Sequence, residues 1–181
     1  MESGCFRERL LQRIGMNDIH EITCLTQKNN IRKQELYELI FDADDRVAYQ
    51  ATWCLTHFSL YENRWLYNKQ DLLINEVLVC KHPGKRRLVL DLLYRQPLAN
   101  PPRIDFLDFC MERMISKDEL PGVQSLCMKL AYELCRPIPE LQHELRALME
   151  IIEPDMLVPS TRASRKNILK AMQAGKSMQI Y

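Results

Sequence analysis

Residues 36–58, LYELIFDADDRVAYQATWCLTHF, decide the fold. Leu36, Leu39 and Ile40 have the three- and four-residue spacing that places apolar side chains on one face of an α-helix. A short acidic segment, residues 42–45, follows them, and a second apolar stripe starts at Val47. An aspartate carboxylate can accept hydrogen bonds from the free N–H groups of a first helical turn, so Asp45 is expected to cap the second helix. The stretch predicts two helices, over residues 31–42 and 45–59, joined by a tight turn.

The second of these helices has counterparts at intervals of 38 residues. Asp45 is followed in that register by Pro83, Pro121 and Pro159, and proline is favoured in a first helical turn, where its missing N–H is not needed. Five further registers are apolar at 16 of their 20 positions, although only 46% of the chain is hydrophobic. They are Val47, Lys85, Val123 and Thr161; Ala51, Val89, Cys127 and Arg165; Cys54, Leu92, Leu130 and Ile168; Leu55, Leu93, Ala131 and Leu169; and Phe58, Gln96, Leu134 and Met172. One face of four helices repeats, as expected for stacked helix pairs.

Helical periodicity also dominates the rest of the chain. It predicts further helices near residues 4–14, 17–28, 69–80, 84–95, 102–116, 121–135, 138–152 and 160–174. Segment 60–68 is expected to add a short turn. Residues 96–102, QPLANPP, form the clearest linker, because three prolines cannot sit inside a helix.

The stretch 36–58 resembles a HEAT repeat: an amphipathic helix, an acidic turn, and then Arg-Val with small and apolar residues. Segments 82–94, 120–134 and 159–172 look like further copies, although 82–94 and 120–134 have Pro-Gly in place of the usual Asp. The resemblance covers roughly residues 30–174 and implies an all-α fold, a right-handed α–α superhelix of about four HEAT-like helix pairs. Residues 1–29 are expected to form a helical N-terminal cap, and residues 30–181 the repeat array, within one compact domain overall.

Composition narrows the function classes. Lys and Arg number 25 and Asp and Glu 24, so a net charge of +1 gives no global attraction to nucleic acid. Seven cysteines occur, an odd number without Cys-x-x-Cys spacing, which favours free thiols and therefore a reducing cytoplasm. No stretch approaches 18 uncharged apolar residues and the N-terminus has no signal-peptide core, so no membrane association is expected.

No residue pattern points to catalysis or to a cofactor. His20, His57, His82 and His143 are isolated in the sequence, and Cys80-x-His82 has no second pair with metal-finger spacing. Neither a Gly-x-Ser-x-Gly elbow nor a Gly-rich phosphate loop is present. We therefore expect no catalytic residue, no metal site and no cofactor.

The remaining feature is the outer stripe of the second helices. At 100° per residue, the side chains that point away from the apolar face are those of Arg46, Tyr49, Gln50, Trp53 and His57. HEAT-like arrays line their concave surface with second helices, so the resemblance implies that this stripe binds a partner. The candidate partner-binding residues are Arg46, Tyr49, Trp53, His57, Arg87, Asp91, Tyr94, Arg95, Lys129 and Tyr132. In the alternative interpretation, Trp53 and Tyr49 pack against a neighbouring helix and the charges are merely solvated.

These observations favour a non-catalytic protein-interaction scaffold. The alternative is a nucleic-acid-binding protein or a HEAT-like DNA glycosylase, because Arg46, Trp53, Arg87, Asp91 and Arg95 resemble in kind the concave-face residues of such enzymes. Two basic clusters suit phosphate: Lys81, Lys85, Arg86, Arg87 and Arg95; and Arg162, Arg165, Lys166, Lys170 and Lys176. A third possibility is a subunit of a larger complex. The C-terminal Met178, Ile180 and Tyr181 are docking candidates, although this end is expected to be disordered.

Overall fold

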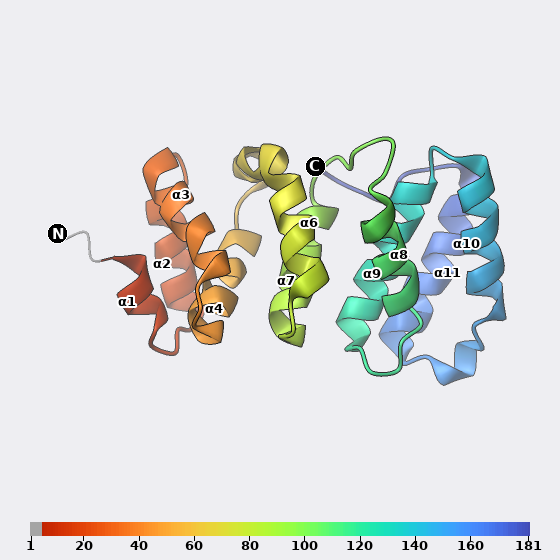
Figure 1. Cartoon of the computed structure of the whole chain (residues 1–181), viewed down its shortest axis with the longest axis horizontal. Helices are drawn as coiled ribbons and strands as arrows, with labels where there is room; N and C mark the ends of the chain where they lie inside the picture. The colour runs from red at the N-terminus through yellow and green to blue at the C-terminus, as the bar shows by residue number, and fades with distance from the viewer. Residues whose placement is uncertain (1–4) are drawn as a thin grey trace. The chain divides into compact units, whose positions relative to one another are not determined.

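The computed structural model describes residues 5–181, and this range contains helices and no strand (Figure 1). The chain divides into two compact units, of which the first extends to Leu92 and takes in Tyr181, and the second comprises Leu93–Ile180. The all-α fold class is therefore confirmed. The division into a cap over residues 1–29 and an array over residues 30–181, and the right-handed sense of the superhelix, stay predictions.

The first unit is built around α4. Its helices are α1 (Phe6–Leu10), α2 (Met16–Thr26), α3 (Asn30–Glu38) with a 3₁₀ turn η1 (Leu39–Phe41), α4 (Asp45–Thr56), α5 (Leu60–Asn63), the 3₁₀ turn η2 (Arg64–Lys69), α6 (Gln70–Val79) and most of α7 (Pro83–Tyr94). α4 contacts α1, α2, α3 and η1, so it is the central helix of this group (Figure 1).

The second unit is built around α9 in the same way. It contains α8 (Ile104–Arg113), α9 (Pro121–Cys135), α10 (Pro139–Ile151), the 3₁₀ turn η3 (Pro154–Met156) and α11 (Pro159–Ala174). α9 contacts α8, α10 and α11, and the four helices run side by side (Figure 1).

The 38-residue register sets the helix starts. α4, α7, α9 and α11 begin at Asp45, Pro83, Pro121 and Pro159, the four residues of that register. The expected cap at Asp45 is wrong by one position, because the carboxylate that accepts from the N–H groups of Arg46 and Val47 belongs to Asp44. Asp45 instead occupies the first helical turn, where a negative charge is favoured by the helix dipole.

The apolar positions of the repeating registers are buried, except for Leu169 and Met172 of α11, which are half-buried. Cys54, Leu92, Leu130 and Ile168 are each 0% exposed. The polar exceptions are satisfied in place: the buried Lys85 holds its Nζ 2.7 Å from Glu76 Oε1, and Arg165 donates from Nε to the Met149 carbonyl at 2.7 Å. Because a buried polar group is costly unless it is hydrogen-bonded, these partners explain how the apolar register tolerates a charge.

Two expected segments differ from the structure. One helix is expected over residues 4–14, of which residue 4 lies outside the described residues. The observed helix ends early, at Leu10. Residues 11–15 then form a loop, which the amide side chain of Gln50 holds through hydrogen bonds to Gln12 and Ile14, with a third to Leu10 at the end of α1. Segment 60–68 is more ordered than a turn, since α5 and η2 occupy it.

Candidate partner-binding faces

A row of aromatic rings in tilted and edge-to-face contact runs along the outer side of α4 in the first unit. Trp53 lies between Tyr49 and His57, with ring centroids 6.3 Å away on either side. His20 of α2 extends the row beyond His57 at 6.1 Å, and His82 extends it beyond Tyr49 at 5.4 Å. These spacings are those of attractive aromatic pairs. We call these five residues the aromatic row; three histidines that are isolated in the sequence thus lie within one cluster.

His57, the last ring but one on one side of the row, and His82, at the other end, lie against the backbone. His57 Nδ1 lies 3.0 Å from the Trp53 carbonyl oxygen, which holds the imidazole against its own helix. At the other end, a Cβ atom on Gly84 would lie 3.0 Å from Tyr49 Cε2 and 3.1 Å from His82 Cε1. Glycine at the start of α7 therefore permits the close approach of Tyr49 and His82.

A pocket of about 470 Å³ adjoins the aromatic row. Its lining residues are Arg13, Ile14, Arg46, Tyr49, Gln50 and Trp53. Gln50 is only 5% exposed, because its amide bonds Leu10, Gln12 and Ile14 at 2.7 to 2.9 Å. Arg46 Nη1 donates to the Leu11 carbonyl at 3.2 Å. The outer stripe of α4 is thus one wall of the pocket, and the loop of residues 11–15 is the other.

Each of the two interpretations of Trp53 and Tyr49 has a counterpart in the geometry. Both side chains are half-buried and pack against neighbouring rings, yet both also line the pocket. Of the other candidates in this unit, Arg87 is exposed and Asp91 is half-buried on α7. Neither Arg87 nor Asp91 is among the described residues that line the pocket. The assignment of these residues to a binding site stays a prediction.

A different face lies on the second unit, at α9 and the end of α7. Lys129 Nζ lies 5.6 Å from the ring centroid of Tyr94. Tyr94 and Tyr132 donate from their hydroxyls to the carbonyls of Met178 and Lys176, at 2.8 and 2.7 Å. The end of the chain, expected to be disordered, is therefore hydrogen-bonded over residues 176–179. Arg95, the remaining candidate, is half-buried next to Tyr94.

Glu133 is the functional candidate that the sequence reasoning missed. Its side chain is 1% exposed and accepts three hydrogen bonds, from the Met178 N–H at 2.6 Å, Ser177 Oγ at 3.0 Å and Arg136 Nε at 3.0 Å. The available signal was its register: Glu133 follows His57 and Arg95 at 38-residue intervals on the outer stripe. We call Tyr94, Tyr132 and Glu133 the tail face.

Both tyrosines of the tail face are held as hydrogen-bond donors. Burial, assisted by the negative charge of Glu133, raises the pKa of Tyr94 to about 12. The same two causes raise the pKa of Tyr132 above its ordinary value. Each phenol therefore keeps its proton at neutral pH and can donate to a carbonyl oxygen.

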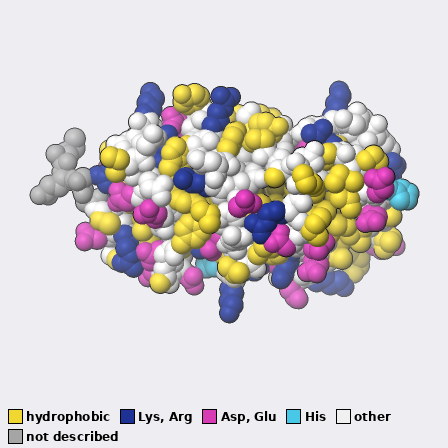
Figure 2. Space-filling model, turned by 45° about the horizontal axis from the view of Figure 1, so that its top comes forward, with side chains coloured by type: hydrophobic (Ala, Val, Ile, Leu, Met, Phe, Trp, Pro, Cys, Tyr) yellow, Lys and Arg dark blue, Asp and Glu magenta, His cyan; other side chains and the backbone are white. Residues whose placement is uncertain are grey.

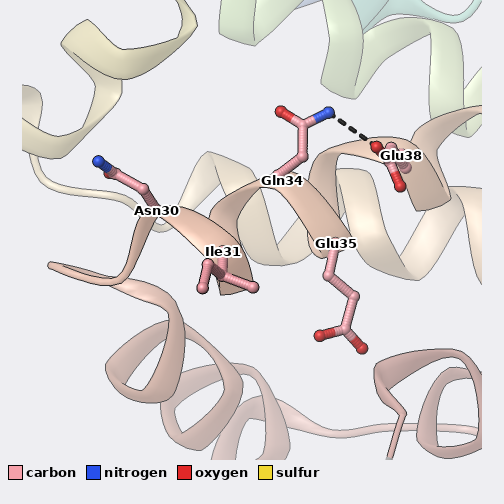
Figure 3. A pocket seen from close by; sticks show the side chains of 5 residues that line it. All are labelled: Asn30, Ile31, Gln34, Glu35 and Glu38. Atoms are coloured by element: carbon pink, nitrogen blue, oxygen red, sulfur yellow. Dashed lines mark hydrogen bonds between the residues drawn. The ribbon is translucent and has the colours of Figure 1, made fainter.

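Another hollow lies along α3 in the first unit (Figure 3). Asn30, Ile31, Gln34, Glu35 and Glu38 line it, and Gln34 donates to Glu38 at 2.9 Å. The Glu35 carboxylate points away from that pair and accepts from the Phe6 N–H and from Arg32, both at 2.8 Å. Its charge therefore serves to attach α1 to α3, and the hollow is a groove on a single helix.

The buried thiols are unsuited to nucleophilic chemistry. Burial raises the pKa of Cys54 and of Cys135 to about 12, and it also raises that of Cys110. The thiolate is the reactive form, so these groups stay protonated and inert at neutral pH. Within residues 5–181 no group of three or more His, Cys, Asp or Glu side chains is arranged to hold a metal ion.

The repeated helix pairs, with their buried registers and outer side chains, define an all-α repeat protein. A family model described as a HEAT repeat domain matches residues 6–172, and the chain belongs to that family. The match includes residues 6–29 together with the array. Neither the curated proteins nor the solved structures gave a match. In the described part of the chain no helix is both long and apolar enough to cross a membrane.

Proposed function

We propose that this chain is a non-catalytic interaction module that binds a protein partner through the outer sides of its second helices. The observation that carries the proposal is the pocket beside the aromatic row. Trp53, Tyr49 and Arg46 line it together, and tryptophan, tyrosine and arginine are the residue types that most often anchor protein interfaces. Membership of the HEAT repeat family supports the same function, since repeat arrays offer extended binding surfaces.

The distribution of charge supports a protein partner over nucleic acid. On the face shown in Figure 2, basic and acidic side chains are interspersed. Several members of the two basic clusters have partners within the protein: Lys85 pairs with Glu76, Arg86 donates to the Cys80 carbonyl at 2.6 Å, and Arg162 donates to the Pro154 carbonyl at 2.9 Å. Arginines engaged in this way contribute less to a phosphate-binding surface.

The chain offers a matched pair of tryptophans for the test. Trp53 lines the pocket, whereas Trp65 of η2 packs against Tyr37 and Lys69. Tagged wild type, Trp53→Ala and Trp65→Ala would be used to capture proteins from the source cells, with quantification by mass spectrometry. We expect Trp53→Ala to lose at least about tenfold of a specific partner, equivalent to a hot-spot loss, and Trp65→Ala to retain it. Equal capture by both variants would contradict the proposed face.

A duplex-binding titration at two salt concentrations tests the alternative function. The proposal predicts no measurable binding to a short DNA or RNA duplex. Binding that weakens steeply with salt would show that basic side chains release counterions from phosphates, and it would replace the proposed function by nucleic-acid binding.

A further inference from the structure

The last residues of the chain lie along the tail face as an extended segment. α11 ends at Ala174, and Gly175 follows with a φ of +62°, in the left-handed region that glycine adopts without strain. A left-handed residue at this point turns the chain out of the helix. Residues 176–179 then reach Tyr132, Glu133 and Tyr94 of the same unit.

Most of the recognition is directed at the main chain of this segment. Tyr132 donates to the Lys176 carbonyl at 2.7 Å, Glu133 accepts from the Met178 N–H at 2.6 Å, and Tyr94 donates to the Met178 carbonyl at 2.8 Å. Every amino acid has a carbonyl, and every one except proline has an N–H. These three bonds would therefore form with an extended segment of almost any sequence.

Two side chains add a sequence requirement. The Ser177 hydroxyl donates to Glu133 at 3.0 Å. The Gln179 amide donates to the carbonyls of Tyr94 and Gln96, at 2.7 and 3.0 Å. Lys176 is exposed and Ile180 is 75% exposed, so the tail face does not select the side chains at these two positions. The face thus selects a hydroxyl residue followed two positions later by glutamine.

We infer that the tail face is a binding site for an extended segment of a partner protein that carries Ser or Thr followed two positions later by Gln. Residues 176–179 occupy this site as an intramolecular ligand until the partner segment replaces them. The inference rests on the proposed interaction function and adds the class of partner.

Residues 176–179 are connected to α11 through Gly175, and this connection sets how strongly they compete with a partner segment for the tail face. A short flexible connection gives an effective concentration on the order of 1 mM. If a free peptide binds the open face with a Kd of about 0.1 mM, the tail therefore weakens the apparent affinity of that peptide by about tenfold.

The first experiment opens the site without altering it. Ser177→Asp replaces a hydroxyl that donates to Glu133 by a carboxylate that cannot donate, and the new charge repels the buried Glu133 carboxylate. Ser160→Asp, on the exposed first turn of α11, adds the same charge as a matched control. A fluorescent peptide with the sequence of residues 174–181, AGKSMQIY, is titrated into each full-length chain. We expect about tenfold tighter binding to Ser177→Asp than to wild type and to Ser160→Asp. Equal affinities for the three chains would overturn the inference.

The second experiment tests main-chain recognition. The same peptide is made with an N-methyl group on the amide that corresponds to Met178, which removes the N–H that Glu133 accepts. A second version has norleucine at that position and keeps the N–H. On Ser177→Asp we expect N-methylation to weaken binding by at least about tenfold, as loss of a charge-assisted hydrogen bond should, and norleucine to leave it unchanged. The opposite ranking would overturn the inference.

The outcomes separate the inference from the proposed function. If Ser177→Asp fails to bind the peptide while the chain still captures a partner that depends on Trp53, the inference fails and the interaction function stands. A concentration-dependent dimer of the unmodified chain, lost in Ser177→Asp, would assign the tail to a second copy and would also overturn the intramolecular arrangement.

Discussion

α4 and α9 occupy the same place in their repeats but present different chemistry on their outer sides. Thr56 and His57 of α4 correspond in register to Tyr132 and Glu133 of α9. In the first unit, His57 belongs to the aromatic row beside a pocket. In the second, Tyr132 and Glu133 bind the main chain of residues 176–178. The comparison teaches that the repeat sets the buried side of each second helix, whereas single residues on the outer side decide what that helix binds.

The largest effect is expected on the side that the two helices share. Leu55 and Leu130 are both 0% exposed at repeating positions. Leu55→Ala and Leu130→Ala should each lower the free energy of unfolding by about 2–5 kcal/mol, because a cavity replaces packed methyl groups. Leu72, which is 54% exposed, serves as the control; Leu72→Ala should cost well under about 1 kcal/mol. Urea unfolding measures all three, and a small loss at either buried leucine would break the shared register.

On the outer side, the equivalent residues Glu133 and His57 should contribute differently to the free energy of unfolding. Glu133→Ala removes the acceptor of three hydrogen bonds at a buried site, so we expect a loss of about 1–3 kcal/mol. His57→Ala should cost less, about 1 kcal/mol or below, since the half-buried ring is partly solvated. Urea titrations of the two variants at one pH give the comparison, and equal losses would show that the tail contributes little.

A smaller effect is expected at the end of the aromatic row. Gly84→Ala places a Cβ 3.0 Å from the Tyr49 ring, and this overlap should outweigh the gain in helix propensity by about 1 kcal/mol. In a Tyr49→Ala background only the 3.1 Å approach to His82 Cε1 remains, so the same substitution should cost less than in wild type. A double-mutant cycle of thermal melts measures the difference. A penalty that is identical in both backgrounds would contradict the described approach of Tyr49 to Gly84.

The alkaline pH dependence should be the smallest effect. Burial raises the pKa of Tyr94 to about 12, above the ordinary value of about 10. Between those two pH values the folded chain holds the proton more tightly than the unfolded chain does, so this contribution is complete below pH 10 and is lost as the pH rises towards 12. Tyr94→Phe should therefore show a shallower loss of stability than wild type between about pH 10 and 11.5 in urea titrations. Identical slopes would contradict a buried, protonated Tyr94.

The architecture could be predicted because its signals are local. Proline and aspartate at 38-residue intervals mark the first helical turns, and the stripe that starts with Val47 marks the buried side. Each of these signals lies within one or two turns of helix. The starts of α4 and α9 could consequently be predicted to the residue, and those of α7 and α11 to within one residue.

The faces could be predicted only in part, because they are made by contacts that carry no periodic signal. Glu133 meets Ser177 and Met178 across 44 and 45 residues of sequence. Gln50 lies on the outer stripe but is buried, since α1 ends at Leu10 and the loop that follows covers it. Tyr49 and Trp53 of the stripe line one pocket, and their assignment to a binding site stays a prediction. The stripe could not indicate that Glu133, a charged position of the same register, would accept hydrogen bonds from Ser177 and Met178.

The most direct measurement is amide hydrogen exchange at Met178 in the full-length chain. Its N–H is bound to Glu133, so the account predicts exchange at least about tenfold slower than in the free peptide of residues 174–181, with the protection lost in Ser177→Asp. Exchange at the rate of the free peptide would contradict an occupied tail face.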